Sequence, residues 1–218
     1  MLVTFSGIDG AGKTTQINLL KEYLSSSKVK YKYLWSRGGY TPGINSLKKM
    51  LRILLGRKAI PMGRSNERNK KMANPFIAYV WLNLAILDLI FYYGVYIRFL
   101  NFNGFVILCD RYIGDTYIDF RLNFKGVPFE KFALWKLLKV VAPKADSSFL
   151  FLVPTEVSLK RSIEKDEPYP DSEEVLRDRL NLYSNTCASV SCEYLVIDGR
   201  DDKALIQSKI RNALNGIL

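Results

Sequence analysis

The sequence predicts an α/β protein, in which one parallel β-sheet is covered by helices on both faces. Short runs of apolar, often β-branched residues alternate along the chain with longer segments of helical character, and this alternation is typical of parallel sheets. With 218 residues, of which 48% are hydrophobic and 24% charged, the chain can bury a large core and differs from disordered sequences. It contains no internal repeat and no low-complexity linker, so we expect a single domain over residues 1–218.

Five apolar runs account for the expected strands, and each has the length of a buried strand. The run FVILCD is the clearest, because the turn-forming pair Asn103-Gly104 precedes it. Strands are expected over Leu2–Ile8, Tyr31–Trp35, Phe105–Asp110, Ser148–Val153 and Tyr194–Asp198. Helices are expected over Lys13–Ser26, Ile44–Leu55, Asp115–Phe124, Pro128–Val141, Pro154–Lys165, Ser172–Ser189 and Asp202–Leu214.

The apolar segment Pro75–Leu100 is long enough to span a membrane. However, Asn83 and Asp88 lie in its middle and Arg98 near its end, and a central aspartate disfavours insertion by about 2.5–3.5 kcal/mol. We therefore expect a long helix of a soluble domain and no membrane span. The first residues have neither the basic region nor the cleavage site of a signal peptide, so a cytoplasmic location is expected.

Composition narrows the chemistry that the protein can carry out. The chain has no histidine, which excludes a histidine-containing catalytic triad, a histidine-ligated zinc site and a histidine pH switch. The three cysteines, Cys109, Cys187 and Cys192, include no CxxC pair and fit a reducing compartment. The net charge of +11 indicates an anionic partner, which could be a nucleic acid, a lipid surface or a phosphorylated small molecule.

A glycine-rich segment between the first strand and the first helix carries the strongest functional signal. Residues 7–14, GIDGAGKT, fit the phosphate-binding pattern GxxxxGK[ST]. Glycines let backbone N–H groups turn towards phosphates, and the helix N-terminus adds positive potential. Lys13 is expected to contact the β- and γ-phosphates, and the Thr14 hydroxyl to bind Mg²⁺. The expected nucleotide-binding residues are Gly7, Ile8, Asp9, Gly10, Ala11, Gly12, Lys13, Thr14 and Thr15.

Two charged residues, Asp110 and Arg111, stand at the end of the strand FVILCD. Open α/β sheets bind ligands at the carboxyl ends of their strands, so we expect Asp110 near the phosphates, where it can hold Mg²⁺ directly or through water. Arg111 can bind a phosphate with two parallel hydrogen bonds. The structural alternative for this pair is a helix N-cap with a surface ion pair.

Beyond these motifs, the chain resembles the thymidylate kinases. The segment FSGIDGAGKTTQ at residues 5–16 is similar to their P-loop, and DRY at 110–112 to their DR[YH] segment. Residues 150–165, LFLVPTEVSLKRSIEK, resemble the strand that leads into the lid of that family. The segment VIDGR at 196–200 resembles its adenine-side loop. The similarity runs along the whole chain in order and is weakest between residues 37 and 103.

The resemblance implies a three-layer P-loop kinase fold with a central five-stranded parallel sheet and a mobile lid over about residues 161–178. It implies ATP and Mg²⁺ as cofactors and phosphoryl transfer to a small-molecule nucleotide acceptor, most simply dTMP to dTDP. Similar proteins are commonly homodimers, and the apolar helix offers a surface for this. In the acceptor site, Asp9 would lie near the sugar hydroxyl and Arg111 and Arg37 would hold the phosphate, with Asp110 and Tyr112 beside them.

The resemblance also implies where catalytic positive charge comes from. Some members place an arginine at the position of Gly10, and members with glycine there draw their catalytic arginines from the lid. The basic residues around the lid are Arg161, Lys165, Arg177 and Arg179. We expect Arg161 to be catalytic together with Lys13, Asp110 and Arg111. Charge on a closing lid would couple chemistry to substrate closure.

The chain departs from the family pattern in two places that bear on the acceptor. After the second strand the family usually carries Arg-Glu-Pro-Gly-Gly, whereas residues 36–43 read SRGGYTPG. The helix before DRY usually carries an arginine that recognises thymine, but no arginine occurs between Lys71 and Arg98. This helix instead offers Asn83 and Asp88 for hydrogen bonds, and aromatic rings at Phe76, Tyr79 and Trp81. These side chains can read an acceptor, or they can face a neighbouring helix or a second subunit.

Two alternatives to dTMP phosphorylation follow. The acceptor can be another nucleotide, a nucleoside or a phosphorylated sugar, with the same transfer chemistry. A different class is a P-loop ATPase that binds nucleic acid or membrane through the apolar helix and the basic segment Gly56–Ala73, which has one acidic residue, Glu67. A strand ending in Asp-Glu would favour that class, but Asp110 is followed by Arg111. We therefore expect the basic segment to be a mobile surface loop and expect no stable nucleic-acid partner.

Overall fold

The computed structural model describes residues 1–36, 74–166, 171–189 and 194–215, together with positions 41, 43, 44, 46, 49 and 53. The predicted helix Ile44–Leu55 lies mostly outside the described residues, and the predicted basic loop lies entirely outside them. The chain forms two compact units. The first comprises Met1–Ser36, Phe99–Ile118 and Lys144–Leu218, and the second Arg37–Arg98 and Asp119–Pro143. The single-domain expectation therefore stays a prediction.

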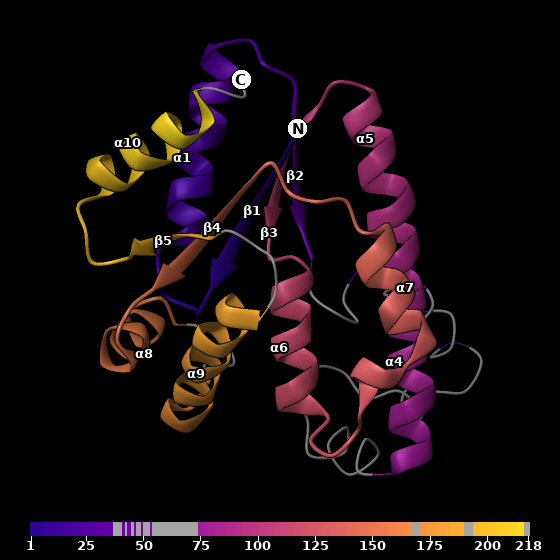
Figure 1. The fold of residues 1–218 in the computed structure, drawn as a ribbon. Helices are drawn as coiled ribbons and strands as arrows, with labels where there is room; N and C mark the ends of the chain where they lie inside the picture. Colours follow the sequence, from indigo (N-terminus) through magenta and orange to yellow (C-terminus); the bar gives the residue numbers. More distant parts are fainter. Residues whose placement is uncertain are drawn as a thin grey trace. The chain divides into compact units, whose positions relative to one another are not determined.

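The first unit contains the predicted parallel sheet of five strands (Figure 1). The central strand, β1, is buried at every position, because its residues are apolar or small and neighbouring strands pair along both of its edges. The strands are β1 (Leu2–Gly7), β2 (Tyr31–Trp35), β3 (Val106–Asp110), β4 (Ser147–Leu152) and β5 (Tyr194–Asp198), in the order β2-β3-β1-β4-β5. Each observed boundary lies within one residue of its predicted position.

The strand register brings the carboxyl ends of the strands to one edge of the sheet. Asp110 at the end of β3 pairs with Phe5 of β1 on one side and with Trp35 of β2 on the other. Gly7 at the end of β1 pairs with Phe151 of β4. Because the chain leaves β1 towards β2 on one side and later returns to β4 on the other, this edge has the topology at which α/β sheets bind ligands.

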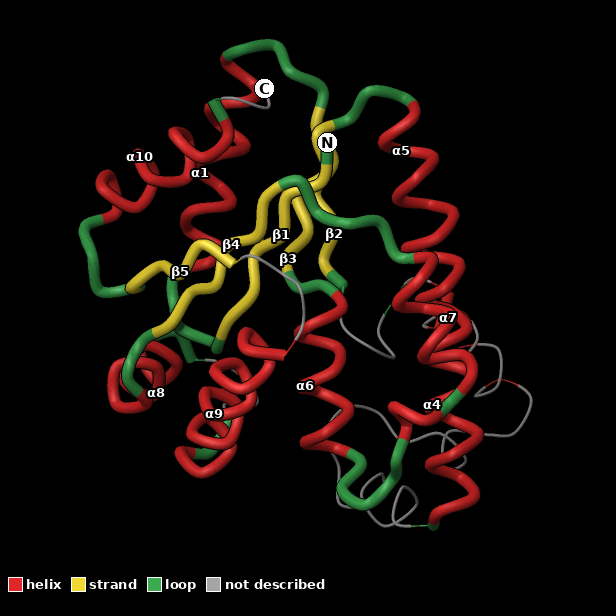
Figure 2. The backbone as a smooth tube through the Cα atoms, in the orientation of Figure 1, coloured by secondary structure: helices red, strands yellow, loops and turns green. Residues whose placement is uncertain are grey.

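Helices flank the sheet of the first unit, as predicted. Helix α1 (Lys13–Ser26) begins and ends where the sequence predicts, and it buries the side chains spaced along one face, Gln16, Ile17, Leu20 and Leu24. It lies beside α10 (Lys203–Leu214), as Figures 1 and 2 both show. Helix α10 begins at the cap residue Asp202, whose carboxylate accepts from the N–H groups of Ala204 and Leu205. The other helices are α6 (Ile113–Asn123, which continues into the second unit), α8 (Thr155–Glu164) and α9 (Glu173–Ser189).

The described residues of the second unit are mostly helical. Helix α4 (Pro75–Phe91) begins at the cap residue Asn74 and continues through a π-helical segment, η1 (Tyr92–Ile97). The segment leads into α5 (Arg98–Phe102), which belongs to the first unit from Phe99 on. Helix α4 packs against α7 (Ala133–Val141). A short 3₁₀ turn, η2 (Phe129–Lys131), precedes α7.

The helical segment Pro75–Phe102 has 28 residues, a mean hydropathy of 1.7 in its most apolar stretch, and one third of that stretch buried. Its length and composition would allow it to cross a membrane. Core helices of soluble proteins have the same properties, so one such helix does not assign a membrane span.

Candidate active site

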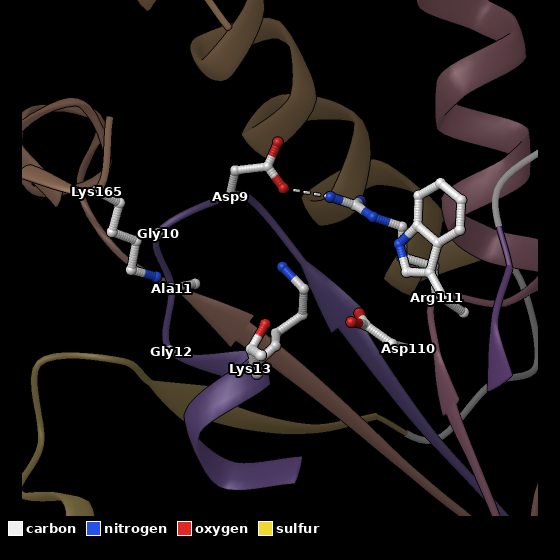
Figure 3. A pocket seen from close by; sticks show the side chains of 10 residues that line it. Asp9, Gly10, Ala11, Gly12, Lys13, Asp110, Arg111 and Lys165 are labelled. Atoms are coloured by element: carbon white, nitrogen blue, oxygen red, sulfur yellow. Dashed lines mark hydrogen bonds and ion pairs between the residues drawn. The ribbon is translucent and has the colours of Figure 1, made fainter. Parts of the chain in front are cut away.

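The P-loop wraps around the start of α1 at the carboxyl end of β1 (Figure 3). Gly7 ends the strand with φ +131°, and a Cβ atom there would lie 2.1 Å from the carbonyl oxygen of Phe151. Any side chain at this position would collide with β4. Gly12 has φ +95° and precedes the first residue of α1, Lys13. The two glycines therefore allow the tight turn that the loop needs between strand and helix.

One small cavity of about 140 Å³ lies inside this loop. It collects residues from the ends of β1, β2 and β3 and from the end of α8. Figure 3 labels Asp9, Lys13, Asp110, Arg111 and Lys165 around it. Its lining consists of Asp9, Gly10, Ala11, Gly12, Lys13, Thr14, Trp35, Asp110, Arg111 and Lys165. The structure thus brings the predicted phosphate-binding loop and the predicted DR pair to the same cavity.

Lys13 is held inside the loop, with 7% of its surface exposed. Its Nζ donates to the carbonyl oxygens of Gly7 at 3.0 Å and Ile8 at 2.6 Å. Burial, and to a smaller extent the nearby positive charge of Arg111, lower the pKa of Lys13 to about 8, against the opposing effect of three carboxylates. The anionic charge of a phosphate would raise this pKa again, so anion binding and protonation of Lys13 support each other.

Asp110 is 6% exposed at the end of β3. The hydroxyl of Tyr33, on the neighbouring strand β2, donates to its Oδ2 at 3.1 Å. Burial and the charge of Asp110 raise the pKa of Tyr33 above its ordinary value, so Tyr33 stays a hydrogen-bond donor. The carboxylate is thereby held in one orientation at the edge of the cavity.

Arg111 is buried, with 3% of its surface exposed, and its φ of +76° is unusual for a non-glycine residue. Its guanidinium donates to the carboxylate of Asp9, to the carbonyl oxygen of Gly7 at 3.4 Å and to Asp115 Oδ1 at 3.5 Å. Figure 3 shows its contact with Asp9 across the cavity. Burial rules out the surface ion pair considered for this residue. Strained backbone conformations are concentrated at functional sites.

Sequence reasoning missed the role of Asp115, which joins three segments beneath the P-loop. Asp115 is 1% exposed and accepts from Ser6 Oγ at 2.6 Å, from the Tyr112 N–H at 3.0 Å and from the Tyr183 hydroxyl at 2.5 Å. Its position four residues after Arg111, in the first turn of α6, was the available signal.

Tyr183 completes this network from α9, and no sequence signal pointed to it. Its hydroxyl donates to Asp115 and accepts from the Gly7 N–H at 3.2 Å. Burial, together with the charge of Asp115, raises the pKa of Tyr183 well above its ordinary value. The side chain therefore stays neutral and ties α9 to the start of the P-loop.

Two of the four basic lid candidates lie at the P-loop. Arg161 of α8 donates from Nη1 to the carbonyl oxygens of Gly10 at 2.9 Å and Gly199 at 3.0 Å. Lys165, one turn further along, lines the cavity. Arg161 thus connects the P-loop with the segment that follows β5.

The other two candidates have local partners instead. Arg177 is exposed and pairs with Glu173 on the same helix at 2.8 Å, which fits a solvated helix face. Arg179 is buried and pairs with Asp171 at 3.3 Å, with side-chain exposures of 2% and 1%. The contacts of these two arginines explain their presence without a role in the cavity.

The remaining predicted site residues lie around the cavity to different degrees. Thr14 is exposed and lines it, whereas Thr15 is half-buried in the first turn of α1 and does not. Tyr112 is 6% exposed and also lies outside the lining. Arg37 lies outside the described residues.

The polar residues considered as acceptor-reading groups on α4 have partners in the second unit. Asp88 accepts a hydrogen bond from the hydroxyl of Thr41, which is buried. Asn83 donates from Nδ2 to the carbonyl oxygen of Tyr79 at 2.9 Å. These contacts fit the structural interpretation of both residues.

Comparison with known proteins gives a consistent result. A family model described as thymidylate kinase matches residues 5–210. A protein named thymidylate kinase from Sulfurihydrogenibium sp. (strain YO3AOP1) is 28% identical over 213 residues, covering 97% of this chain and 95% of that protein. One of the same name from Bartonella henselae is 28% identical over 223 residues, covering 99% and 95%. Another, from Thermosipho africanus, is 22% identical over 200 residues, covering 91% and 90%.

This single match over residues 5–210 includes the P-loop, the Asp110–Arg111 pair and the four basic lid candidates. The α/β fold with its all-parallel sheet agrees with it. The predicted family is confirmed: this chain belongs to the thymidylate kinase family.

Proposed function

We propose that this protein transfers the γ-phosphoryl group of ATP to dTMP, producing dTDP and ADP. The observation that carries the proposal is the single cavity shared by the P-loop and the Asp110–Arg111 pair. The P-loop would bind the phosphates of the donor nucleotide, and the Asp110–Arg111 pair would bind the phosphate of the acceptor. The names of the relatives, which are thymidylate kinases, support dTMP as the acceptor.

In this proposal the P-loop N–H groups and Lys13 bind the β- and γ-phosphates of ATP. Thr14 and Asp110 both line the cavity, and their hydroxyl and carboxylate oxygens are the hard ligands that Mg²⁺ prefers. They fit an ion that also takes phosphate oxygens and water. Thr14 and Asp110 would hold this ion, and it would neutralise part of the phosphate charge.

The transfer itself needs orientation and positive charge more than a base. An oxygen of the dTMP phosphate attacks the γ-phosphorus, and the bond from that phosphorus to the β–γ bridging oxygen breaks, leaving its electron pair on ADP. The attacking phosphate is already anionic, so the absence of histidine from the chain is no obstacle. Arg111, with Arg37, would hold this phosphate, while Asp9 and Tyr112 would lie near the sugar.

Positive charge on the migrating group would come from Lys13, Arg161 and Lys165. Arg161 and Lys165 lie on α8, at the start of the proposed lid over residues 161–178. Arg161 already contacts the carbonyl oxygen of Gly10, the position at which some members carry an arginine in the loop itself. Closure of the lid would then bring positive charge to the phosphates only when both substrates are present.

A coupled assay of ADP release tests this function. Turnover should be highest with dTMP among monophosphates, nucleosides and sugar phosphates. A maximum with another acceptor would leave the transfer chemistry intact and replace dTMP, an outcome that the arginine-free helix α4 makes worth testing. ATP hydrolysis without any acceptor, accompanied by tight and salt-dependent binding of single-stranded DNA, would instead support the P-loop ATPase.

We further propose that the protein is a homodimer that covers one face of α4 and of the η1 segment that continues it. Large apolar side chains recur on this face at helical spacing and are exposed to 38–75% in the single chain: Phe76, Val80, Leu84, Leu87, Phe91 and Val95. Such a stripe is typical of a helix-packing surface. Sedimentation should give a dimer mass for the wild type, and Phe91→Glu should shift it to monomer. A monomeric wild type would refute this assignment.

A further inference from the structure

Arg111 pairs with the carboxylates of Asp9 and Asp115, which differ in exposure. The side chain of Asp9 is 31% exposed and lines the cavity, so an incoming phosphate can take its place at the guanidinium. The side chain of Asp115 is 1% exposed and is not part of the cavity lining. A ligand in the cavity cannot displace this second carboxylate. Its pull on Arg111 therefore affects how freely the guanidinium can turn to a phosphate.

The contact between Arg111 and Asp115 is long for a buried ion pair. Arg111 Nη1 lies 3.5 Å from Asp115 Oδ1, whereas charge-assisted N–H···O hydrogen bonds are usually about 2.7–2.9 Å long. Both side chains are buried, and burial strengthens the attraction between opposite charges. The extra distance between the two groups therefore needs a cause.

Other donors already occupy the Asp115 carboxylate. Its Oδ2 accepts from a hydroxyl and from a backbone N–H. Its Oδ1 accepts from the Tyr183 hydroxyl at 2.5 Å and from the Gly7 N–H at 3.4 Å. A carboxylate oxygen has two lone-pair sites, so Arg111 comes to Oδ1 as a third donor. Competition for this oxygen explains why the ion pair is long.

Tyr183 is the nearest of the donors at Oδ1, and its hydroxyl is fixed in place. The side chain is 2% exposed, and the hydroxyl also accepts from the Gly7 N–H at 3.2 Å. Burial, together with the charge of Asp115, raises the pKa of Tyr183 well above its ordinary value, so the hydroxyl keeps its proton. Tyr183 thus supplies a neutral donor to the oxygen that Arg111 would otherwise bind.

We propose that Tyr183 is a positioning residue for the acceptor phosphate. By holding Asp115 Oδ1, its hydroxyl keeps the Arg111 guanidinium at the cavity and out of a tight buried ion pair with Asp115. This role rests on the proposed kinase function, in which Arg111 binds that phosphate. Because Tyr183 lies on α9, the helix in which the proposed lid over residues 161–178 ends, the orientation of Arg111 also depends on this helix.

Steady-state kinetics of the full chain with ATP and dTMP separate this role from a purely structural one. In Tyr183→Phe, Oδ1 of Asp115 loses its nearest donor and becomes available to Arg111. KM for dTMP should then rise about fivefold or more, while KM for ATP changes less than about twofold. Tyr96→Phe is the matched control, because the Tyr96 ring packs on Tyr92 and no hydrogen bond of its hydroxyl is found among the residues that the structure describes.

A second substitution should reverse the effect. Asp115→Asn removes the negative charge that captures Arg111 in Tyr183→Phe, so KM for dTMP in the double variant should be at least about threefold lower than in Tyr183→Phe. A purely structural pair would show a further loss instead. Asp115→Asn alone keeps an oxygen that accepts from the Tyr112 N–H, and its KM for dTMP should not exceed that of the wild type. This single variant carries the test if circular dichroism shows that Tyr183→Phe does not fold.

The length of the ion pair is a readout that does not depend on turnover. In a crystal structure of ligand-free Tyr183→Phe, the distance from Arg111 Nη1 to Asp115 Oδ1 should shorten from 3.5 Å to about 2.8 Å. An unchanged distance, an equal rise of both KM values, a raised KM for dTMP in Asp115→Asn, or a double variant worse than Tyr183→Phe would overturn the proposal. If the wild type phosphorylates an acceptor other than dTMP, the same comparison is made with that acceptor, so a failure of the proposed function and a failure of this role are distinguishable.

Discussion

Replacing Tyr183 with phenylalanine removes one buried hydroxyl group and keeps the ring in place. The hydroxyl donates to the Asp115 carboxylate at 2.5 Å and accepts from the Gly7 N–H at 3.2 Å. A buried hydrogen bond to a charged group contributes about 1.5–3 kcal/mol and a neutral one about 0.5–1.5 kcal/mol. The free energy of unfolding should therefore fall by about 2–4 kcal/mol.

The loss should not depend on pH in the neutral range. Burial and the charge of Asp115 raise the pKa of Tyr183 well above its ordinary value, so the hydroxyl stays protonated between about pH 6 and pH 9. Asp115 keeps the donors Ser6 Oγ and the Tyr112 N–H in the variant, which continue to stabilise its carboxylate.

Urea unfolding followed by circular dichroism measures the effect. Tyr96→Phe is the matched control, because the Tyr96 ring packs on Tyr92 and no hydrogen bond of its hydroxyl is found within the described residues. A loss of less than about 1 kcal/mol in Tyr183→Phe, or one equal to the control, would show that the network beneath the P-loop does not form as described.

Four further predictions concern the active site. Lys13→Ala should lower kcat by at least about 10³ while the circular dichroism spectrum stays unchanged; near-normal turnover would remove Lys13 from the phosphate site. Because the pKa of Lys13 is about 8, ATP affinity measured by calorimetry should fall as pH rises through about 8, and this pH dependence should be absent in Lys13→Ala. Arg111→Ala should raise KM for dTMP about tenfold or more, with a much smaller effect on KM for ATP; equal effects would exclude it from the acceptor site. Arg161→Ala should lower kcat about tenfold or more with little change in either KM, and an unchanged kcat would make Arg161 structural.

The lowered pKa of Lys13 also makes the free energy of unfolding depend on pH. The folded protein binds a proton at Lys13 more weakly than the unfolded chain does, whose lysine pKa is 10.5. Between about pH 8 and 10.5 the unfolded state binds more protons, so this residue makes the protein more stable as pH rises. In Lys13→Met this rise of the unfolding free energy with pH should be absent. The free energy of unfolding measured at the two ends of this pH range checks it.

Local patterns predicted the strands and the first helix because the determinants are local. Apolar runs mark the buried strands, and the Gly-Lys step fixes the start of α1 at Lys13. The predicted helix Pro128–Val141 was wrong at Phe132, which has an extended backbone between η2 and α7, while its ring packs on Tyr79 at 4.7 Å. That contact joins distant parts of the sequence, so no local sequence pattern predicts it.

The expected continuous helix over Pro75–Leu100 also missed its π-helical segment. Gly94 lies in that segment, and a Cβ atom there would be 3.3 Å from a methyl group of Val141 on α7. The close approach of two helices explains the glycine, but the extra backbone residue per turn depends on packing that the sequence alone does not reveal.

The site was predictable to the extent that it follows from motif and strand order. The P-loop and Asp110 could be placed together because parallel strands end at one edge, and Trp35 could have been found by the same reasoning, since it pairs with Asp110 in register. Tyr183 could not, because it arrives from α9 and meets Asp115 across 68 residues of sequence. A buried hydrogen-bond donor on a distant helix leaves no regular residue spacing by which the sequence could reveal it.

The ion pair between Arg111 and Asp9 belongs to both halves of the site at once. Asp9 lies in the P-loop, which is proposed to hold the donor phosphates, and its side chain is proposed to lie near the acceptor sugar, while Arg111 is proposed to bind the acceptor phosphate. We expect a ligand in either half to loosen this pair, so that the ligand that arrives second finds it already loosened. The affinities of the two substrates should therefore rise together, each by the same factor in the presence of the other, as thermodynamic linkage requires.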